Sequence, residues 1–242
     1  MKYDNKISYK AYGKYALFSD PILRVGGEKC SYSVPTYQSL IGITDAIYWK
    51  PTFKWVIDRV RVMKPIQTQS KSVKPMRYND SASNDLSIYT YLYDVEYQVE
   101  AHFEWNLDRP DLEKDRNEHK HYVIANTMIE RGGKRDVFLG ARECVAYAEP
   151  CVFGEGAGAY DDREEVDFGV MFHGFDYPPN EKQQELFARL SRIVMKRGVI
   201  EFERPEACVL PKKKIKKYAY KKVETKGNDP EDLKAVEREG AL

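Results

Sequence analysis

The first 153 residues of the chain contain several segments in which apolar and polar side chains alternate, as they do in half-buried β-strands. The clearest is 89–107, where apolar residues occupy every second position from Val95 to Trp105. Further strands are predicted at 7–18, at 53–63 with one slip in the alternation, and, as one strand or two, at 136–153. The stretches 19–35 and 64–90 are irregular; we expect a loop for the first and an insertion or long hairpin for the second.

Two segments have apolar residues at helical spacing, 36–49 and 117–131. Pro35 or Thr36 begins the first, and the pair Lys50-Pro51 ends it. In the second, Asp115 and Glu118 have capping-box spacing, and two glycines after Arg131 end the helix. Its buried face is predicted to comprise Val123, Ile124, Thr127 and Met128. The order β, α, β, β, α, β indicates a ferredoxin-like α+β domain over residues 1–153.

The pattern changes after residue 153. A loop rich in glycine and acidic residues is followed by a predicted strand at 166–177, a helix at 180–198 that ends at Gly198, and a short strand at 199–204. These elements predict a smaller, antiparallel β-rich domain over 154–211. Residues 212–242 begin with seven lysines in eleven positions, and we expect a basic, disordered tail that is solvated or acts as a flexible arm for phosphates.

Composition narrows the function classes. The net charge is +1, so binding of nucleic acid must depend on local basic patches. The four cysteines form no C-x-x-C pair and have no histidine at zinc-finger spacing, so neither a metal site nor another cofactor is expected. The chain has no secretion signal and no apolar run of membrane-spanning length, which favours a cytoplasmic protein without a membrane partner.

The candidate chemistry lies at the start of the second predicted helix, in the sequence DRNEHKHY, where His119, Lys120 and His121 fall in the first turn. Cations there oppose the helix dipole, but exposed backbone N–H groups favour a phosphate. The dipole also lowers the pKa of a histidine, so that a neutral imidazole is available to remove the proton of an RNA 2′-OH, while a lysine stabilises the phosphate. An ordinary solvent-facing helix start explains the same residues equally well.

Basic residues elsewhere suggest that a phosphate backbone follows the predicted sheet. Between residues 59 and 77 no acid interrupts the basic positions, and glycines accompany the basic positions between 131 and 142. The predicted RNA-binding residues are Arg59, Arg61, Lys64, Lys71, Lys74, Arg77, Arg131, Lys134, Arg135 and Arg142.

Several of these motifs resemble one known family. The stretches SDPILRVGGEKCSYSVPTYQSLIGITDAIYWKPT, DRVRVMKPI, NLDRPDLEKDRNEHKHY and RDVFLGARECVAY are similar to the CRISPR-associated RAMP endoribonucleases of the type I-C (Dvulg) subtype. The resemblance runs from about residue 7 to about 208. It implies metal-independent cleavage of CRISPR repeat RNA at the base of its hairpin, which leaves a 2′,3′-cyclic phosphate and a 5′-hydroxyl.

The resemblance also implies partners and site residues. The protein would remain on the 5′ handle of the mature crRNA with other subunits of the type I-C surveillance complex, and duplex DNA is a further candidate ligand. Its catalytic residues correspond to Tyr48 in the motif IYWKP and to Lys120 and His121 in KHY. With an ordinary pKa near 10, Tyr48 would orient the 2′-OH or donate a proton, His121 would act as general base or acid, and Lys120 would neutralise the phosphate. His119 receives no role.

Two alternatives remain open at this point. The protein could hold the 5′ handle without cutting it, which the presence of all three residues argues against. It could also be a small-molecule phosphatase or nucleotide-binding protein, which calls for a carboxylate cluster that holds a metal. The acidic run at 160–165 is better explained as a solvated loop.

Overall fold

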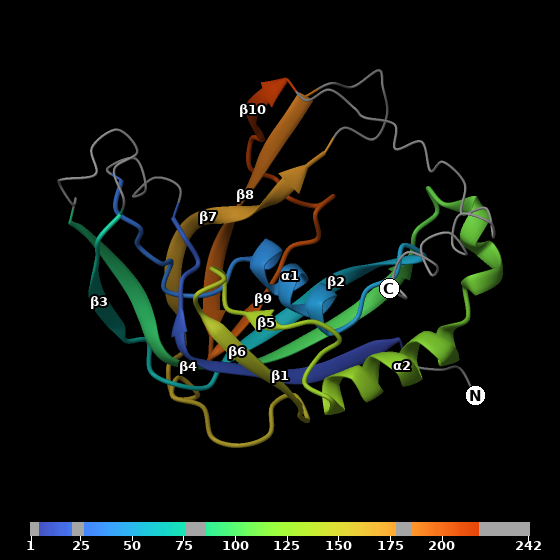
Figure 1. Cartoon of the computed structure of the whole chain (residues 1–242), viewed down its shortest axis with the longest axis horizontal. Helices are drawn as coiled ribbons and strands as arrows, with labels where there is room; N and C mark the ends of the chain where they lie inside the picture. The colour runs from blue at the N-terminus through green and yellow to red at the C-terminus, as the bar shows by residue number, and fades with distance from the viewer. Residues whose placement is uncertain (1–4, 21–26, 76–85, 178–184, 218–242) are drawn as a thin grey trace, which may run out of the picture.

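The structure, a computed structural model, describes residues 5–20, 27–75, 86–177 and 185–217. It is an α+β fold in which an extended antiparallel sheet carries helices α1 (Tyr37–Ile47) and α2 (Glu118–Glu130) on one face (Figure 1). At its centre, β1 (Lys6–Ala16), β2 (Phe53–Val62), β4 (Ser87–Trp105) and β6 (Val145–Pro150) lie in the order β2-β4-β1-β6. The predicted succession β, α, β, β, α, β is therefore present, with β3 (Thr68–Val73) inserted before β4.

Alternation along β4 produces the core as predicted. Its odd-numbered residues from Val95 to Phe103 are buried, and they face the helices together with the buried residues of β1. A hydrogen bond of 2.7 Å between the Tyr9 and Thr44 hydroxyls joins β1 to α1 within this layer. Each fully buried aliphatic or aromatic side chain contributes about 1.5–3 kcal/mol, so the sheet–helix layer dominates the stability of the fold.

The slip predicted in the alternation of β2 is a β-bulge. Ile57 pairs with Ala101 and Arg59 with Glu100, so Asp58 is the extra residue of β2. The bulge changes which residues face the core, and Val60 and Val62 are buried after it.

The irregular stretch 64–90 contains a hairpin. β3 pairs with the first part of β4, from Thr68 opposite Leu92 to Val73 opposite Ser87. The hairpin extends away from the helices, at the left of Figure 1. Residues 76–85 lie outside the described part of the chain.

The helix predicted at 180–198 is wrong over its described part. Residues Glu185–Lys196 form strand β8, which pairs with β7 (Val166–Asp176) and with β9 (Val199–Glu201). Buried positions recur at every second residue from Ser191 to Met195, the period of a strand. Arg197 and Gly198 both have positive φ, 48° and 78°, and form the turn between β8 and β9 where we expected a helix stop.

The tail prediction is also wrong in part. Residues Lys213–Lys217 form strand β10, which pairs with the edge of β8, while 218–242 lie outside the described residues. On its other side β8 pairs with β9, and β9 pairs with β2. The sheet therefore continues from the central strands into the C-terminal ones. A two-residue strand β5 (Val137–Phe138) pairs with β6. Among the described residues, no helix has the length and apolar character to cross a membrane.

Candidate active site

Tyr48 is positioned by the end of α1. The helix stops at Ile47, and Tyr48 has extended backbone angles (φ −156°, ψ 125°) while its N–H still donates to the carbonyl of Thr44. The indole N–H of Trp55, in β2, donates to the Tyr48 carbonyl over 2.7 Å. This contact fixes the connection between α1 and β2, and the Tyr48 side chain points toward the first turn of α2.

The start of α2 differs from the predicted capping box. The N-cap is Asn117, whose side chain accepts a hydrogen bond from the N–H of Lys120 over 3.0 Å. Asp115 lies before it, as the last residue of the 3-10 helix η2 (Pro110–Asp115), and its carboxylate is engaged elsewhere. The predicted box at Asp115 and Glu118 is therefore wrong, because an amide closer to the helix satisfies the free N–H.

The buried face of α2 is also shifted from the predicted one. His121, Ala125 and Ile129 are its buried residues, spaced four apart, whereas Val123 is 45% exposed. Ile124 and Met128 pack only partly against the core. The helix therefore turns a histidine of its first turn directly toward the sheet.

The side chains of Tyr48 and His121 meet there. The Tyr48 hydroxyl lies 2.8 Å from Nδ1 of His121, and Nε2 of His121 lies 2.8 Å from the backbone carbonyl of Asp115. Because a carbonyl can only accept, Nε2 donates to it, and Nδ1 shares the other hydrogen bond with the Tyr48 hydroxyl. Both ring nitrogens are thus occupied.

Aromatic rings surround the histidine. The ring centroids of Phe53, Trp105 and Phe103 lie 5.2, 5.8 and 6.2 Å from that of His121. His121 is 0% exposed and Tyr48 2% exposed. Burial, aided by the nearby Asp115 carboxylate, raises the pKa of Tyr48 to about 12, so the phenol remains protonated at neutral pH.

Lys120 reaches the same place through Asp115. Its Nζ lies 2.5 Å from Oδ1 of Asp115, and the other carboxylate oxygen accepts from the Thr52 hydroxyl over 2.7 Å. These two hydrogen bonds hold the pKa of Asp115 below its usual range. The Lys120 and Asp115 side chains are 49% and 30% exposed, so this ion pair is the part of the cluster that solvent reaches.

The arrangement has the parts of a general acid–base site, with an imidazole, a protonated phenol and an ammonium group within one cluster. It brings together all three residues that were predicted to be catalytic. Asp115 and Thr52 join the cluster without having been predicted as site residues. No local signal marks Thr52, since only the folding of β2 beside the 106–115 segment brings its hydroxyl to Asp115.

Comparison with known proteins identifies the family. The family model described as CRISPR-associated protein (Cas_Cas5) matches residues 7–203, most of the chain. The chain belongs to the Cas5 family of CRISPR-associated proteins. A crystal structure described as a CRISPR-associated protein has 37% identity and a TM-score of 0.72, over 85% of this chain and 95% of that one.

Two curated relatives bear the name CRISPR pre-crRNA endoribonuclease Cas5d. The one from Mannheimia succiniciproducens is 34% identical over 119 residues, 40% of this chain and 52% of the relative. The one from Thermus thermophilus is 34% identical over 155 residues, 60% of this chain and 64% of the relative. The match thus spans about half of the first relative's length and somewhat under two thirds of the second's.

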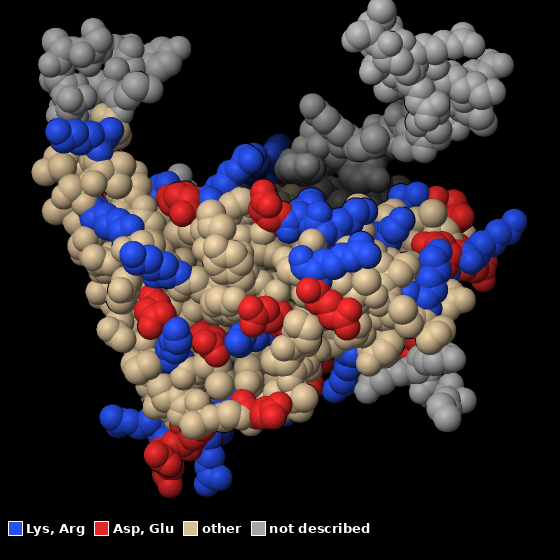
Figure 2. Space-filling view, turned by 60° about the horizontal axis from the view of Figure 1, so that its bottom comes forward, with Lys and Arg blue, Asp and Glu red and all other residues tan. Residues whose placement is uncertain are grey.

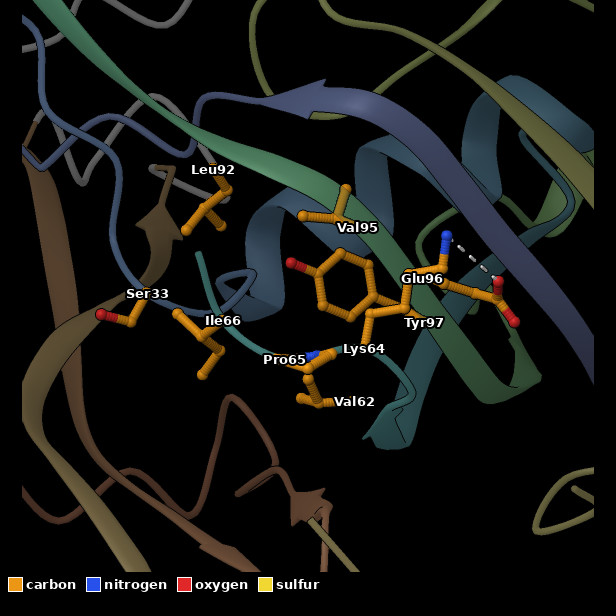
Figure 3. Close-up of a pocket in the computed structure, with 9 residues that line it drawn as sticks. All are labelled: Ser33, Val62, Lys64, Pro65, Ile66, Leu92, Val95, Glu96 and Tyr97. Carbon is orange, nitrogen blue, oxygen red and sulfur yellow. Dashed lines mark ion pairs between the residues drawn. The ribbon is translucent and has the colours of Figure 1, made fainter. Parts of the chain in front are cut away.

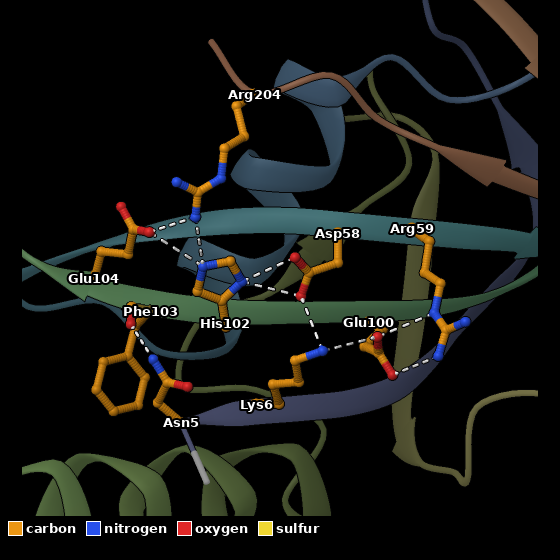
Figure 4. A network of polar contacts seen from close by, with 9 residues as sticks. All are labelled: Asn5, Lys6, Asp58, Arg59, Glu100, His102, Phe103, Glu104 and Arg204. Atoms are coloured by element: carbon orange, nitrogen blue, oxygen red, sulfur yellow. Dashed lines mark hydrogen bonds and ion pairs between the residues drawn. The ribbon is translucent and has the colours of Figure 1, made fainter. Parts of the chain in front are cut away.

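Two of the predicted RNA-binding arginines of this Cas5 chain are committed to internal contacts. Arg59 binds both carboxylate oxygens of Glu100, at 3.0 and 3.1 Å, within a charged network on β2 and β4 (Figure 4). The Arg61 side chain is only 7% exposed and binds Asp161 at 2.7 Å and the Gly156 carbonyl at 2.9 Å. In this structure the Arg61 guanidinium anchors the 154–165 loop instead of facing solvent, and contact of Arg61 with RNA stays a prediction.

Lys64 of the Cas5 chain lies in the connection between β2 and β3, and Lys71 lies in β3. Lys64 pairs with Asp94 at 2.7 Å and lies 4.0 Å from Glu96, beside a small pocket (Figure 3). Nζ of Lys71 lies 3.2 Å from the centre of the Tyr15 ring, a cation–π contact. Lys74 is exposed, and Arg77 lies outside the described residues.

The remaining predicted RNA-binding residues, Arg131, Lys134, Arg135 and Arg142, are exposed. Arg131 follows the C-terminus of α2, ten residues from His121 and therefore roughly 15 Å along the helix. Arg135 donates to the Asp45 carbonyl over 2.9 Å. Gly133 has φ of 116°, and a Cβ there would lie 2.9 Å from the Arg135 carbonyl, so this loop needs glycine. The structure does not bring these residues into the Tyr48–His121 cluster.

The surface of the Cas5 chain in Figure 2 has basic and acidic side chains interspersed, without one continuous basic stripe on that face. Of the acidic run at 160–165, Asp161 is engaged with Arg61. Within the described ranges, no group of three or more His, Cys, Asp or Glu side chains is arranged to hold a metal ion. His119 is exposed on the first turn of α2.

Proposed function

We propose that this chain is an endoribonuclease that cleaves CRISPR repeat RNA at the base of its hairpin, without a metal ion. In the reaction, a 2′-OH loses its proton and its oxygen attacks the adjacent phosphorus. The bond to the 5′-oxygen breaks, that oxygen gains a proton, and the products are a 2′,3′-cyclic phosphate and a 5′-hydroxyl. The contact of 2.8 Å between the Tyr48 hydroxyl and His121 Nδ1, beside Lys120, is the observation that carries the proposal.

The roles follow from the chemistry of each group. His121 exchanges protons with the RNA, as the one side chain of the cluster whose ordinary pKa lies near neutrality. Tyr48, which its raised pKa keeps protonated, holds the imidazole in place through the hydrogen bond to Nδ1. Lys120 stabilises the negative charge that accumulates at the phosphorus during attack.

The test is incubation of the purified protein with a repeat hairpin RNA in EDTA, followed by analysis of the product ends. The proposal predicts one cleavage position, a cyclic phosphate on the upstream product and a 5′-hydroxyl on the downstream product. Products with a 5′-phosphate, or cleavage that requires a divalent ion, would exclude it.

A second candidate function is retention of the crRNA 5′ handle without cleavage. It is favoured by one observation: His121 is fully buried, with both ring nitrogens occupied by Tyr48 and Asp115. The same incubation separates the two functions, because a binding subunit would shift the RNA in a gel and leave it intact. We favour cleavage, since both curated relatives that match this chain are named CRISPR pre-crRNA endoribonucleases.

Further parts of the proposal concern binding and organisation. We propose that RNA contacts Lys71, Lys74, Arg131, Lys134, Arg135 and Arg142, all outside the interior, whereas Arg59 and Lys64 contribute only if their ion pairs open. The proposed partners are repeat RNA, other type I-C surveillance-complex subunits and, without sequence preference, duplex DNA. A cytoplasmic location remains a prediction.

We also propose the domain layout expected from the sequence, a ferredoxin-like unit over 1–153 followed by a smaller unit over 154–211. The central order β2-β4-β1-β6, with both helices on one face, supports the first unit. The pairing of β9 with β2 gives the two units a shared sheet.

A further inference from the structure

The contacts of Asp115 point to a role that the proposed reaction does not assign. Its carboxylate holds Nζ of Lys120 at 2.5 Å and the Thr52 hydroxyl at 2.7 Å, and its backbone carbonyl holds Nε2 of His121 at 2.8 Å. Asp115 therefore binds both the ammonium group of Lys120 and the imidazole of His121. It does so from outside α2, at the end of η2.

The geometry leaves a single side from which RNA can enter the cluster. Tyr48, on the Nδ1 side of the imidazole, is 2% exposed and lies among the core aromatic rings. The Asp115 carboxylate, on the Nε2 side, is 30% exposed and lies 3.5 Å from Nε2. A phosphate that approaches Lys120 therefore has to compete with the Asp115 carboxylate that already holds its Nζ.

We propose that Asp115 is a positioning residue that occupies, in the free protein, the place on Lys120 that an RNA phosphate takes on binding. A carboxylate and a phosphate compete for the same ammonium group and repel each other. When the phosphate binds Lys120, the Asp115 carboxylate leaves it, and the chain segment that covers His121 Nε2 is released with it. The histidine becomes accessible only when a phosphate is in place.

The proposal rests on the proposed function, because it takes an RNA phosphate as the competing anion. Its test is a binding titration at low salt with a repeat hairpin RNA that carries a 2′-deoxy nucleotide at the scissile position. Asp115→Asn keeps an acceptor for Thr52 and removes the charge that competes for Lys120. We expect the dissociation constant to fall by about two- to fivefold, the range that an exposed ion pair supports.

Two comparisons make the test specific. Asp111→Asn removes the same charge from the same segment, but its carboxylate pairs with Arg109 and not with Lys120, so its affinity should change much less. In a Lys120→Met background the gain from Asp115→Asn should disappear, since the two residues act on one phosphate. Thr52→Val removes the hydroxyl that anchors Asp115 but leaves the competing carboxylate, so it should give no comparable gain.

The proposal fails if Asp115→Asn binds no more tightly than Asp111→Asn, or if the gain persists without Lys120. Thermal unfolding of each variant, measured beside the titration, separates a charge effect from a loss of folded protein. Cleavage of the all-ribose RNA by the unmodified protein tests the proposed function separately. Binding that improves in Asp115→Asn while the unmodified protein cuts nothing would overturn the endoribonuclease and keep the competition at Lys120.

Discussion

At the scale of single residues, the cluster is unusual in burying the histidine that is proposed to be catalytic. His121 makes two hydrogen bonds and touches four aromatic rings, so any substitution affects the core as well as the chemistry. Activity measurements on this residue therefore need a matched measurement of folding. His121 was identified from the sequence through the family resemblance of the KHY motif. The sequence around it predicted neither its burial nor its hydrogen bond to Asp115.

His121→Ala should reduce the single-turnover cleavage rate by roughly 10²–10⁴-fold, the usual contribution of a general acid–base residue. RNA affinity should change little, because the buried ring offers no contact to phosphates in the free protein. His119→Ala, an exposed neighbour on the same helical turn, is the control. Equal losses in the two variants would mean that the wrong histidine has been assigned.

Tyr48→Phe removes one oxygen and preserves the ring packing. It leaves Nδ1 of His121 without its partner in a buried site, which should cost about 1–3 kcal/mol of unfolding free energy. The cleavage rate should fall while the cut position is retained. Chemical denaturation combined with single-turnover kinetics measures both effects, and a variant as stable and as active as the parent would remove Tyr48 from the site.

At the scale of elements, the buried face of α2 differs from the face that its apolar residues predicted. Apolar side chains predicted a buried face through Val123, yet the helix buries the face that carries His121, Ala125 and Ile129.

Ile129→Ala should therefore lower the free energy of unfolding by about 2–5 kcal/mol, the range for large-to-small changes in a core. Val123→Ala, at an exposed position of the same helix, should change stability by less than about 0.5 kcal/mol. Urea unfolding decides, and comparable losses at both positions would contradict the described orientation.

Strand β10 permits a test of the lysine-rich segment that leaves the fold intact. Lys212 and Lys214 make ion pairs with Asp176 and Glu185, whereas Lys213, Lys216 and Lys217 have no ion pair among the described residues. Replacing these three by glutamine should flatten the log–log salt dependence of RNA binding by about 2 units, because each lysine–phosphate interaction accounts for about 0.7 of the slope. Repeat and scrambled RNA should be affected alike, and the cut position should not move. An unchanged slope would leave β10 with a purely structural role.

At the scale of the whole molecule, the local hydrophobic pattern predicted those features of a strand that depend only on which of its residues face the core. The alternating burial of β4 and the bulge in β2 are two examples, because both can be read from the order of apolar and polar residues within one strand. β8 was predicted as a helix, because its strand state depends on pairing with β7, β9 and β10. The site lay beyond local patterns for the same reason, since the end of α1 and the start of α2 meet only across the folded sheet.

The charged network of Figure 4 joins three distant parts of the chain and gives stability a pH dependence. Nδ1 of His102, in β4, lies 2.9 Å from Asp58 of β2, and Arg204, beyond β9, reaches Glu104 at 2.5 Å. The hydrogen bond to Asp58 raises the pKa of His102 above its ordinary value of 6.5. A raised pKa means that the folded state binds the proton more tightly, so this stabilisation is fully present below pH 6.5 and is lost as the pH rises through the folded pKa.

The stability difference between the parent and His102→Gln should accordingly shrink as the pH is raised from about 6 to 8.5. Denaturant unfolding at a series of pH values measures it. His119→Gln serves as the control for an exposed histidine. A difference that stays constant or grows with pH would show that Asp58 does not stabilise the charged form of His102.

The central claim is that an RNA 2′-OH is the nucleophile and that the Tyr48–Lys120–His121 cluster acts on it. The most direct measurement is single-turnover cleavage of two repeat hairpin RNAs in EDTA, identical except for a 2′-deoxy substitution at the scissile nucleotide. We predict cleavage of the all-ribose RNA to a 2′,3′-cyclic phosphate, and tight binding without cleavage of the substituted RNA. Cleavage of the 2′-deoxy RNA at a similar rate would contradict the account.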